Sequence, residues 1–264
     1  MTPNSTTMPI STDEKEIDRW SIRDIMQIIF FAVFLRPLMK FLIGYRVYGK
    51  ERLPLSGPFV LIANHSSHLD TVSLLSLFPL HQLRAIQPVA AADYFERNRL
   101  ISWFSRSFFN ILPIERHRVT PGNNPIDRMI AALRTGKSLI LFPEGTRGSD
   151  GEVSEFRPGI ARLVEAIPGL RVVPVYLINI GRCMPKGSVL PAPLFCEARV
   201  GEPRSFYNHG NRRRELLEKL RASVCELREA DGGIQPAREA PIARPRPKVI
   251  PAASNPKMTC RKPE

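Results

Sequence analysis

The sequence predicts an α/β protein with a mostly parallel or mixed, twisted sheet flanked by helices, and with an N-terminal membrane-associated helical segment. Short apolar runs of strand length alternate with runs of helical length between about residues 45 and 200. Hydrophobic residues make up 43% and charged residues 24% of the 264 residues, as in a globular α/β domain and unlike a disordered chain or a multi-span membrane protein. The most apolar stretch, residues 25–35, lies near the N-terminus.

Changes in composition divide the chain into four parts. Residues 1–24 form a polar N-terminal segment that lacks the basic and apolar regions of a secretory signal. Residues 25–44 are apolar and residues 45–232 form the α/β domain. Residues 233–264 form a disordered, basic, proline-rich tail, because proline and basic residues dominate after Gly232-Gly233.

The apolar segment is too short to cross a bilayer. Residues 25–35 give eleven residues, whereas crossing about 30 Å of hydrocarbon takes about 20 residues in a helix. Because Arg36 and Pro37 interrupt the run, we expect two short helical pieces, kinked or folded back there, that lie in or dip into one leaflet. A buried core helix is the alternative for an apolar run of this length.

Cationic residues beside the apolar segment favour the membrane over the buried helix. Glu51 alone opposes five cations that suit an anionic cytoplasmic leaflet: Arg36, Lys40, Arg46, Lys50 and Arg52. We therefore predict association with the cytoplasmic face of the cell membrane. Because the first predicted strands come after Tyr45, we also expect the remaining chain to fold without residues 1–44.

Strands and helices alternate along the predicted domain. The predicted strands span residues 59–63, 83–89, 111–114, 138–142 and 171–178, with 194–200 as a further candidate. Two predicted helices begin with a proline and the last is charged and amphipathic; the helices span residues 70–77, 99–108, 125–134, 158–166 and 211–230. Pro174, inside a strand-like run, predicts a sheet edge or a bulge.

Net charge indicates the kind of binding partner, and cysteine content indicates the redox compartment. The 38 Lys and Arg exceed the 25 Asp and Glu and leave a net charge of +13, which favours an anionic partner: nucleic acid, a lipid headgroup surface or a phosphorylated substrate. The four cysteines are far apart and form no Cys-x-x-Cys pair, so a reducing, cytosol-facing compartment is expected. His65 and His68 lack further histidines at metal-ligand spacing, so we expect no metal.

The first candidate functional motif follows a predicted strand, at the carboxyl end where open α/β sheets place their ligands. It reads Asn64-His65-Ser66-Ser67-His68-Leu69-Asp70. With a turn between them, the Asp70 carboxylate can hold one imidazole nitrogen of His65 and leave the other nitrogen as a base. The structural alternative is a helix cap at Asp70 and an incidental surface histidine.

Two further motifs also follow predicted strands. Phe142-Pro143-Glu144-Gly145-Thr146-Arg147-Gly148 has two glycines, which let backbone N–H groups approach a ligand, and a guanidinium that suits phosphate oxygens. Residues 113–118 carry two arginines and a histidine. Taken singly, each of these two motifs is also compatible with a solvent-exposed loop.

Together the motifs resemble a known family. Asn64 to Asp70 resembles the N-H-x-x-x-x-D signature of the glycerolipid acyltransferases, which include lysophosphatidic acid and glycerol-3-phosphate acyltransferases. Residues 142–147 resemble the family's F-P-E-G-T-R block, and Val173-Pro174-Val175-Tyr176 resembles its proline-bearing strand. Ile114-Glu115-Arg116 lies where the family keeps its arginine block, but departs from the common Phe-Ile-Asp-Arg or Phe-Val-Asp-Arg.

The resemblance implies transfer of a fatty acyl group from acyl-CoA or acyl carrier protein to the free hydroxyl of lysophosphatidate (1-acylglycerol-3-phosphate), giving phosphatidate in phospholipid biosynthesis. It makes His65 the catalytic base and Asp70 the residue that orients it. Backbone N–H groups near Gly145 would stabilise the oxyanion, a role usually worth about 3–4 kcal/mol. The implied substrate-binding residues are Asn64, Arg116, Glu144, Gly145, Thr146 and Arg147. Of these, Glu144 is expected to accept from a hydroxyl or to pair with an arginine.

Two alternatives stay open on the sequence. The same chemistry could serve another acceptor: glycerol-3-phosphate, a lyso-ornithine lipid or another lysophospholipid. In a different class, a non-catalytic basic protein would bind nucleic acid through its tail, although the tail has no aromatic residues for base stacking. We therefore predict membrane lipids, a lysophospholipid acceptor and an acyl-CoA or acyl carrier protein donor as partners, no nucleic acid, and no cofactor beyond the donor substrate.

Overall fold

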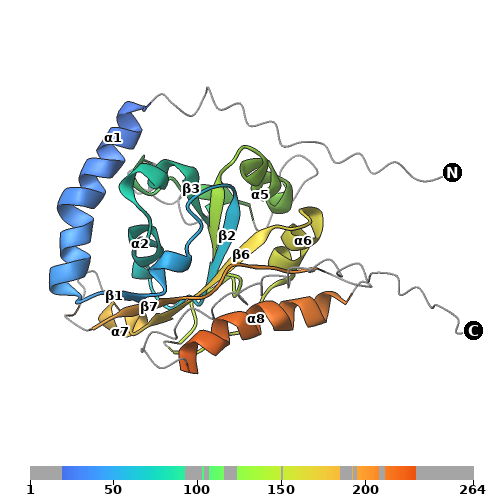
Figure 1. The fold of residues 1–264 in the computed structure, drawn as a ribbon. Coiled ribbons are helices and arrows are strands. Elements are labelled where there is room, and N and C mark those ends of the chain that lie inside the picture. The colour runs from blue at the N-terminus through green and yellow to red at the C-terminus, as the bar shows by residue number, and fades with distance from the viewer. Residues whose placement is uncertain are drawn as a thin grey trace, which may run out of the picture. The chain divides into compact units, whose positions relative to one another are not determined.

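A mixed sheet lies at the centre of the structure, a computed structural model, with helices on both of its faces (Figure 1). The structure describes residues 20–92, 103, 107–115, 124–149, 151–184, 192, 195–207 and 212–229. The polar segment up to residue 19 and the predicted disordered tail, residues 233–264, lie outside the described residues.

The sheet has eight strands. They are β1 (Arg46–Tyr48), β2 (Phe59–Ala63), β3 (Ile86–Ala91), β4 (Leu112–Ile114), β5 (Ser138–Leu141), β6 (Arg171–Ile178), β7 (Glu197–Val200) and β8 (Arg204–Ser205). They lie in the order β1-β7-β6-β2-β5-β3-β4, and β8 also pairs with β6. Strand β6 runs antiparallel to β7 and β8, whereas the other pairings are parallel. The predicted mostly parallel or mixed sheet is confirmed.

Most predicted helices also form. The described helical segments are α1 (Ile22–Ile29), η1 (Phe30–Leu35), η2 (Leu38–Leu42), η3 (Lys50–Arg52), α2 (Leu69–Ser76), η4 (Leu80–Ala85), α5 (Pro125–Arg134), α6 (Pro158–Ala166), α7 (Ile180–Cys183) and α8 (Arg213–Glu229). Helix α5 begins where its pattern predicts, because Asn124 accepts a bond from the Ile126 N–H (3.0 Å) and Pro125 needs no partner in the first turn. The predicted helix at 99–108 lies mostly outside the described residues.

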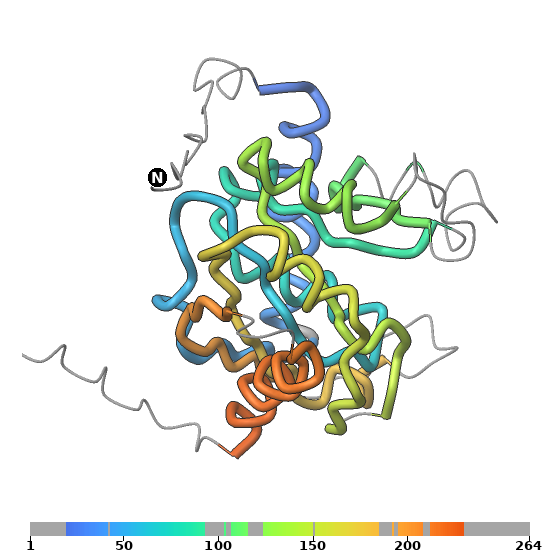
Figure 2. Tube along the Cα trace, turned by 90° about the vertical axis from the view of Figure 1, so that its right-hand side faces the viewer, coloured from blue at the N-terminus to red at the C-terminus, as the bar shows by residue number. Residues whose placement is uncertain are grey.

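Each face of the sheet has its own apolar core. Strand β2 is buried along its whole length, as expected for an inner parallel strand covered on both faces. Its residues Phe59, Leu61 and Ala63 pack with α2, whereas Val60 and Ile62 pack with α5, α6 and α8. Figure 2 shows the start of α1, in dark blue, and α8, in orange to red, at opposite ends of the view.

Two predicted strands begin later than their apolar runs. Strand β3 starts at Ile86 rather than at residue 83, because the preceding residues form the 3-10 turn η4. Leu83 is fully buried in that turn. An apolar residue at a buried position in a turn cannot be told from a strand residue in the sequence. Strand β7 starts at Glu197 rather than at residue 194.

Pro174 lies in an inner strand, so the sheet edge is wrong, but the alternative prediction of a bulge fits, because two residues of β6, Val173 and Pro174, face the three residues 201–203. Pairing of β6 with β7 ends at Val175, and pairing with β8 begins again at Val172. The Pro174 carbonyl faces this interruption, since it accepts from the Gly201 N–H (2.9 Å). The N and O of one strand residue point to the same side, so the missing proline N–H falls where the pairing is interrupted.

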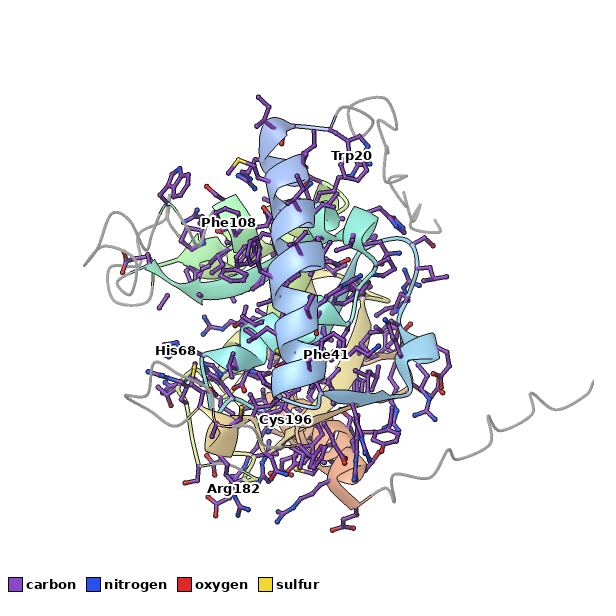
Figure 3. The ribbon with its side chains drawn as sticks, turned by 90° about the vertical axis from the view of Figure 1, so that its left-hand side faces the viewer. Trp20, Phe41, His68, Phe108, Arg182 and Cys196 are labelled. Carbon is purple, nitrogen blue, oxygen red and sulfur yellow. The ribbon has the colours of Figure 1, made fainter. Side chains whose placement is uncertain are left out.

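The N-terminal helix is continuous through Arg36 and Pro37, so the predicted break into two pieces is wrong. Both residues have helical backbone angles, φ −67° and −58°, and Figure 3 shows one helix. The turns around Pro37 have π-type hydrogen bonding. In this wider turn, the proline ring does not clash with the carbonyl of the residue four positions earlier. The helix begins at Ile22, three residues before the predicted boundary, with a capping box between Ser21 and Asp24.

One face of this helix belongs to the core of the domain. Phe31, Leu35, Met39 and Ile43 recur at every fourth position, are at most 6% exposed, and join the same apolar cluster as β2 and α2. Removal of residues 1–44 would therefore uncover part of the core, which argues against the expectation that the remaining chain folds without them. Among the described residues, no helix has the length and apolar character that crossing a bilayer requires.

Candidate active site

The two principal motifs start side by side. Strands β2 and β5 are parallel neighbours, with Ile62 opposite Leu141. The Asn64–Asp70 motif follows β2, and the motif at 142–148 follows β5. Because parallel strands end at the same edge of a sheet, both loops lie at the edge where ligands bind in such folds.

His65 and Asp70 form the predicted pair. The Nδ1 atom of His65 lies 2.8 Å from Oδ2 of Asp70, whose side chain is 0% exposed against 20% for His65. A carboxylate can only accept here, so Nδ1 carries the proton and Nε2 of the neutral imidazole keeps its lone pair. The pair can therefore act as a base through Nε2.

The Asp70 carboxylate is held by more than the imidazole. Its Oδ2 atom also accepts from the backbone N–H groups of Ser66 (2.6 Å) and Ser67 (2.8 Å). Asp70 lies in the first turn of α2, where the helix dipole favours a negative charge. The Oδ1 atom is buried without a hydrogen-bond partner among the described residues. These contacts fix the position of the carboxylate and through it the orientation of the imidazole.

The loop after β5 contacts His65 directly. The Phe142 ring stacks on the imidazole, with centroids 4.0 Å apart and planes 17° apart. The Gly148 N–H donates to the His65 carbonyl (2.8 Å). The two motifs, some 80 positions apart in the sequence, thus form one structural unit.

Glu144 has partners other than those predicted. Its Oε1 accepts from the His65 N–H (2.9 Å) and its Oε2 from the Ser154 N–H (3.1 Å). The residue is 3% exposed. The carboxylate therefore binds two backbone groups, and neither a hydroxyl nor an arginine, within the described residues.

Asn64 is also engaged with the backbone. Its side-chain amide donates to the Leu177 carbonyl (2.9 Å) and accepts from the Leu177 N–H (2.7 Å). It is 1% exposed, so it joins the loop after β2 to β6. We predicted that Asn64 binds substrate; the structure gives its amide this internal partner instead.

The N–H of Gly145 is used within its own turn, where it donates to the Phe142 carbonyl (3.0 Å). An oxyanion contact from other backbone N–H groups near Gly145 stays a prediction. The residue has φ +77°, and a Cβ here would lie 2.5 Å from Nε of Arg157. Glycine is required at this position because of the turn and the close approach of the arginine.

A basic side chain, Arg147, lies near the His65–Asp70 pair. Arg147 is half-buried and Thr146 is exposed. Burial lowers the pKa of His68. Electrostatic interactions with Arg147 and with the neighbouring His65 lower it further, whereas Asp70 raises it. The predicted Arg116 lies outside the described residues, so the structure does not place it.

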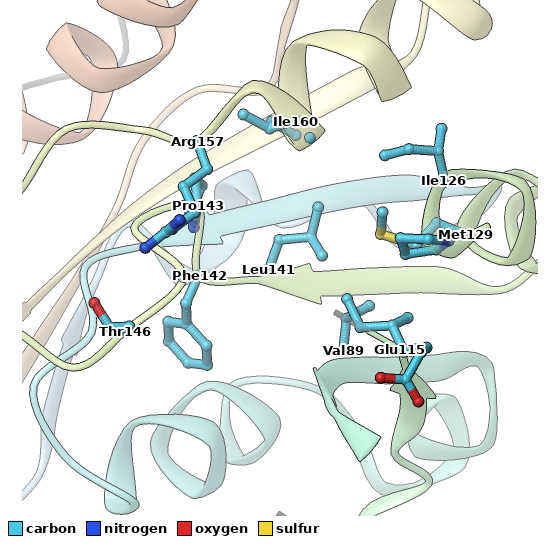
Figure 4. A pocket seen from close by; sticks show the side chains of 14 residues that line it. Val89, Glu115, Ile126, Met129, Leu141, Phe142, Pro143, Thr146, Arg157 and Ile160 are labelled. Atoms are coloured by element: carbon cyan, nitrogen blue, oxygen red, sulfur yellow. The ribbon is translucent and has the colours of Figure 1, made fainter. Parts of the chain in front are cut away.

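An apolar cavity of about 610 Å³ opens next to the motifs (Figure 4). Phe142, Thr146 and Arg157 line one end, and Figure 4 shows Met129 and Glu115 toward the other. Most of the remaining wall is apolar: Val89, Ile114, Ile126, Leu141 and Ile160. A cavity of this size and polarity suits a small apolar ligand or a lipid chain.

Sequence reasoning missed Arg157 and the roles of Phe142 and Ser154. Arg157 precedes α6, and its Nε donates to the Glu144 carbonyl (3.1 Å). Its position before Pro158 marks a helix start but carries no signal of a site. Within the part of the chain that the structure describes, no group of three His, Cys, Asp or Glu side chains could hold a metal ion.

Comparison with known proteins relates the chain to one family. Residues 44–178 match the family model described as Acyltransferase. A chloroplastic 1-acyl-sn-glycerol-3-phosphate acyltransferase of Arabidopsis thaliana is 32% identical over 182 residues, which cover 69% of this chain and 45% of that protein. A 1-acyl-sn-glycerol-3-phosphate acyltransferase of Pseudomonas aeruginosa is 26% identical over 226 residues, covering 83% and 80%.

The fold has a counterpart among solved structures. The crystal structure of the 1-acyl-sn-glycerophosphate (LPA) acyltransferase PlsC from Thermotoga maritima superposes with a TM-score of 0.59 at 22% identity. The match covers 83% of this chain and 88% of that one. It supports the observed architecture of a central mixed sheet flanked by helices.

Proposed function

Since the chain belongs to the acyltransferase family, whose model matches residues 44–178, we propose that it moves a fatty acyl group from a thioester to lysophosphatidate, giving phosphatidate. The observation that carries the proposal is the contact of half-buried His65 with fully buried Asp70, 2.8 Å apart, next to an apolar cavity. The names of the relatives in Arabidopsis thaliana and Pseudomonas aeruginosa support this acceptor.

The pair supplies the proton transfer that the reaction needs. Nε2 of His65 takes the proton of the acceptor hydroxyl as its oxygen attacks the thioester carbonyl carbon. The tetrahedral intermediate then collapses, the C–S bond breaks, and the leaving thiolate takes the proton from the imidazolium. Asp70 stabilises that imidazolium and keeps Nε2 directed toward the substrate. No covalent acyl-enzyme is needed, because the acceptor brings its own nucleophile.

The cavity gives the acyl chain a place beside the reacting carbonyl. Phe142 contacts both the cavity and the His65 ring, so a chain that fills the cavity ends close to the base. Burying apolar surface stabilises the bound chain by about 25 cal/mol per Å². The donor is acyl-CoA or acyl carrier protein, both of which present the same thioester.

Arg147 is the described residue best placed to bind the acceptor phosphate. It lies at the rim, in electrostatic contact with His68 beside the catalytic pair. A guanidinium can bind phosphate oxygens through two parallel hydrogen bonds. We retain Arg116 as a second phosphate ligand and Thr146 as a contact to the glycerol end.

We further propose that the protein associates with the cytoplasmic face of the cell membrane through the outer face of its N-terminal helix. The apolar residues on this face, here called the apolar stripe, are well exposed: Ile22, Ile25, Met26, Ile29, Val33, Phe34, Leu38 and Phe41. Figure 3 places Trp20 and Phe41 near the two ends of this helix. Exposed Lys40 and Arg46 lie near its end, where they can meet anionic lipids.

An acceptor panel tests the proposed function. The full chain is assayed in vesicles with acyl-CoA and, separately, acyl carrier protein, against lysophosphatidate, glycerol-3-phosphate, a lyso-ornithine lipid and lysophosphatidylglycerol. We expect the highest kcat/KM for lysophosphatidate. A higher kcat/KM for another acceptor would replace the substrate within the same chemistry. No transfer to any acceptor would overturn the proposed function.

A further inference from the structure

The geometry points to Glu144 as a positioning residue that holds the main chain of the catalytic histidine, rather than as a ligand of the substrate. The inference rests on the proposed function, since it takes His65 as the base. It concerns one carboxylate, between the loop that follows β2 and the loop that follows β5.

The Glu144 carboxylate bridges the two loops. One oxygen accepts from the His65 N–H (2.9 Å), 79 positions away in the sequence, and the other accepts from the Ser154 N–H (3.1 Å). On the far side of the same residue, the His65 carbonyl accepts from the Gly148 N–H (2.8 Å). Both main-chain polar groups of His65 are thus held by the loop after β5.

This carboxylate is not available to a substrate without a cost. Glu144 is 3% exposed and each oxygen already has a partner. Charge-assisted bonds of this kind are about twice as strong as neutral ones, and breaking them would leave buried N–H groups unpaired. A substrate hydroxyl or phosphate that competed for Glu144 would therefore loosen the loop that carries the base.

The backbone of Glu144 is anchored as well. Arg157 donates from Nε to the Glu144 carbonyl (3.1 Å) and from its own N–H to the Pro143 carbonyl (2.8 Å). The bridge is therefore tied to the start of α6 as well as to Ser154, and it can act as a rigid support.

His65 is held from two directions. Asp70, on α2, fixes Nδ1, whereas the loop after β5 fixes the main chain through Glu144 and Gly148 and covers one ring face with Phe142. Loss of the Glu144 bridge leaves the Asp70 contact but lets the Cα of His65 shift. A shift of the order of 1 Å at a reacting group can cost about 100-fold in rate. The effect belongs to the chemical step and not to substrate binding.

Glu144→Gln tests this role at nearly constant size. A glutamine offers one oxygen to two N–H groups and turns an NH2 toward the other. We expect kcat with lysophosphatidate to fall about 10- to 100-fold, while the apparent KM values for lysophosphatidate and for the thioester change less than about twofold. The matched control is Glu155→Gln, which removes an exposed carboxylate from the same loop and should leave kcat and both KM values as in the native protein.

Amide hydrogen exchange gives a second readout that does not depend on turnover. The His65 amide should exchange faster in Glu144→Gln than in the native chain, and Glu155→Gln should leave it unchanged. A raised KM for lysophosphatidate with kcat kept, or unchanged exchange at His65, would overturn the positioning role. If Glu144→Gln does not fold, Glu144→Asp, which keeps the charge but is one methylene shorter, should show the same loss of kcat and faster exchange.

Different results would refute the proposed function and the positioning role of Glu144. A native protein that transfers no acyl group to any acceptor refutes the proposed function, while the exchange measurement still tests the bridge. An active native protein whose Glu144→Gln variant is equally active refutes the positioning role alone.

Discussion

At the scale of single residues, Arg147 offers the clearest test of acceptor recognition. Arg147→Lys keeps the charge but loses the paired hydrogen bonds of the guanidinium. We expect a higher KM for lysophosphatidate and a nearly unchanged KM for the thioester, with Arg147→Ala costing more, about 2–4 kcal/mol in kcat/KM. Steady-state kinetics check this result.

An acceptor without a phosphate provides the comparison for Arg147. A lyso-ornithine lipid should be nearly indifferent to both substitutions, and Arg162→Lys, on the exposed face of α6, should change neither acceptor. Equal losses with and without the phosphate would mean that Arg147 is structural or serves the donor.

His68 makes the stability of the fold depend on pH. Burial lowers its pKa below the usual histidine value of about 6.5, and its electrostatic interactions with Arg147 and His65 add to this effect. Between the lowered pKa and 6.5 the unfolded chain binds more protons, so the free energy of unfolding falls as the pH drops through this window and is kept in full above it. In urea unfolding at about pH 7.5 and 5.5, on either side of the usual histidine pKa, His68→Gln should lose less stability than the native chain. An equal loss in both proteins would contradict this assignment.

The contact between His65 and Asp70 was predictable from the sequence, but the partners of several other site residues were not. The spacing of His65 and Asp70 predicts their contact, because a strand end, a turn and a helix start leave little freedom. Glu144 and Asn64 bind backbone groups of distant segments, and a motif does not show which main chain will lie beside it.

At the scale of elements, the two faces of the N-terminal helix differ in exposure, and the proposed membrane contact uses the exposed one. Val33 is 59% and Phe41 is 81% exposed on the apolar stripe, whereas Phe31 is 0% exposed in the core. Glutamate at both Val33 and Phe41 should abolish co-sedimentation with anionic vesicles and leave the Tm nearly unchanged. The matched variant Phe31→Ala should destabilise the fold by about 3–5 kcal/mol.

The vesicle experiment has a clear contrary outcome. If the double glutamate variant sediments with vesicles as strongly as the native chain, the membrane contact lies on another surface. High salt should weaken binding through Lys40 and Arg46 but not through the stripe, because salt screens exposed charges beyond about 8–10 Å.

Elements with a strong local signal were predictable, and those that depend on packing were not. Helices 125–134 and 158–166 match their predicted bounds, because a proline in the first turn marks each start. The Arg36-Pro37 break was wrong because four buried side chains on one face hold the helix in the apolar cluster that includes α2. Strand β3 begins later than predicted because Leu83, the buried residue of the 3-10 turn before it, is as apolar as a strand residue.

At the scale of the whole molecule, the N-terminal helix is part of the folding unit. A chain that lacks residues 1–44 loses Phe31, Leu35, Met39 and Ile43 from the core. We expect this variant to unfold at a much lower temperature than the native chain or not to fold, as measured by circular dichroism. Cooperative unfolding at the native temperature would show instead that the helix is an appendage.

The proposed acyl transfer depends on the His65–Asp70 pair. The most direct measurement is the rate of phosphatidate formation from lysophosphatidate and labelled acyl-CoA by the native chain, His65→Ala and Asp70→Asn, with His81→Ala and Asp127→Asn as exposed controls. Both site variants should lose about 10²- to 10⁴-fold in kcat while unfolding cooperatively, and the double variant should be little worse than His65→Ala because both residues serve one proton transfer. Turnover by folded His65→Ala at a rate near that of the native chain would contradict the account.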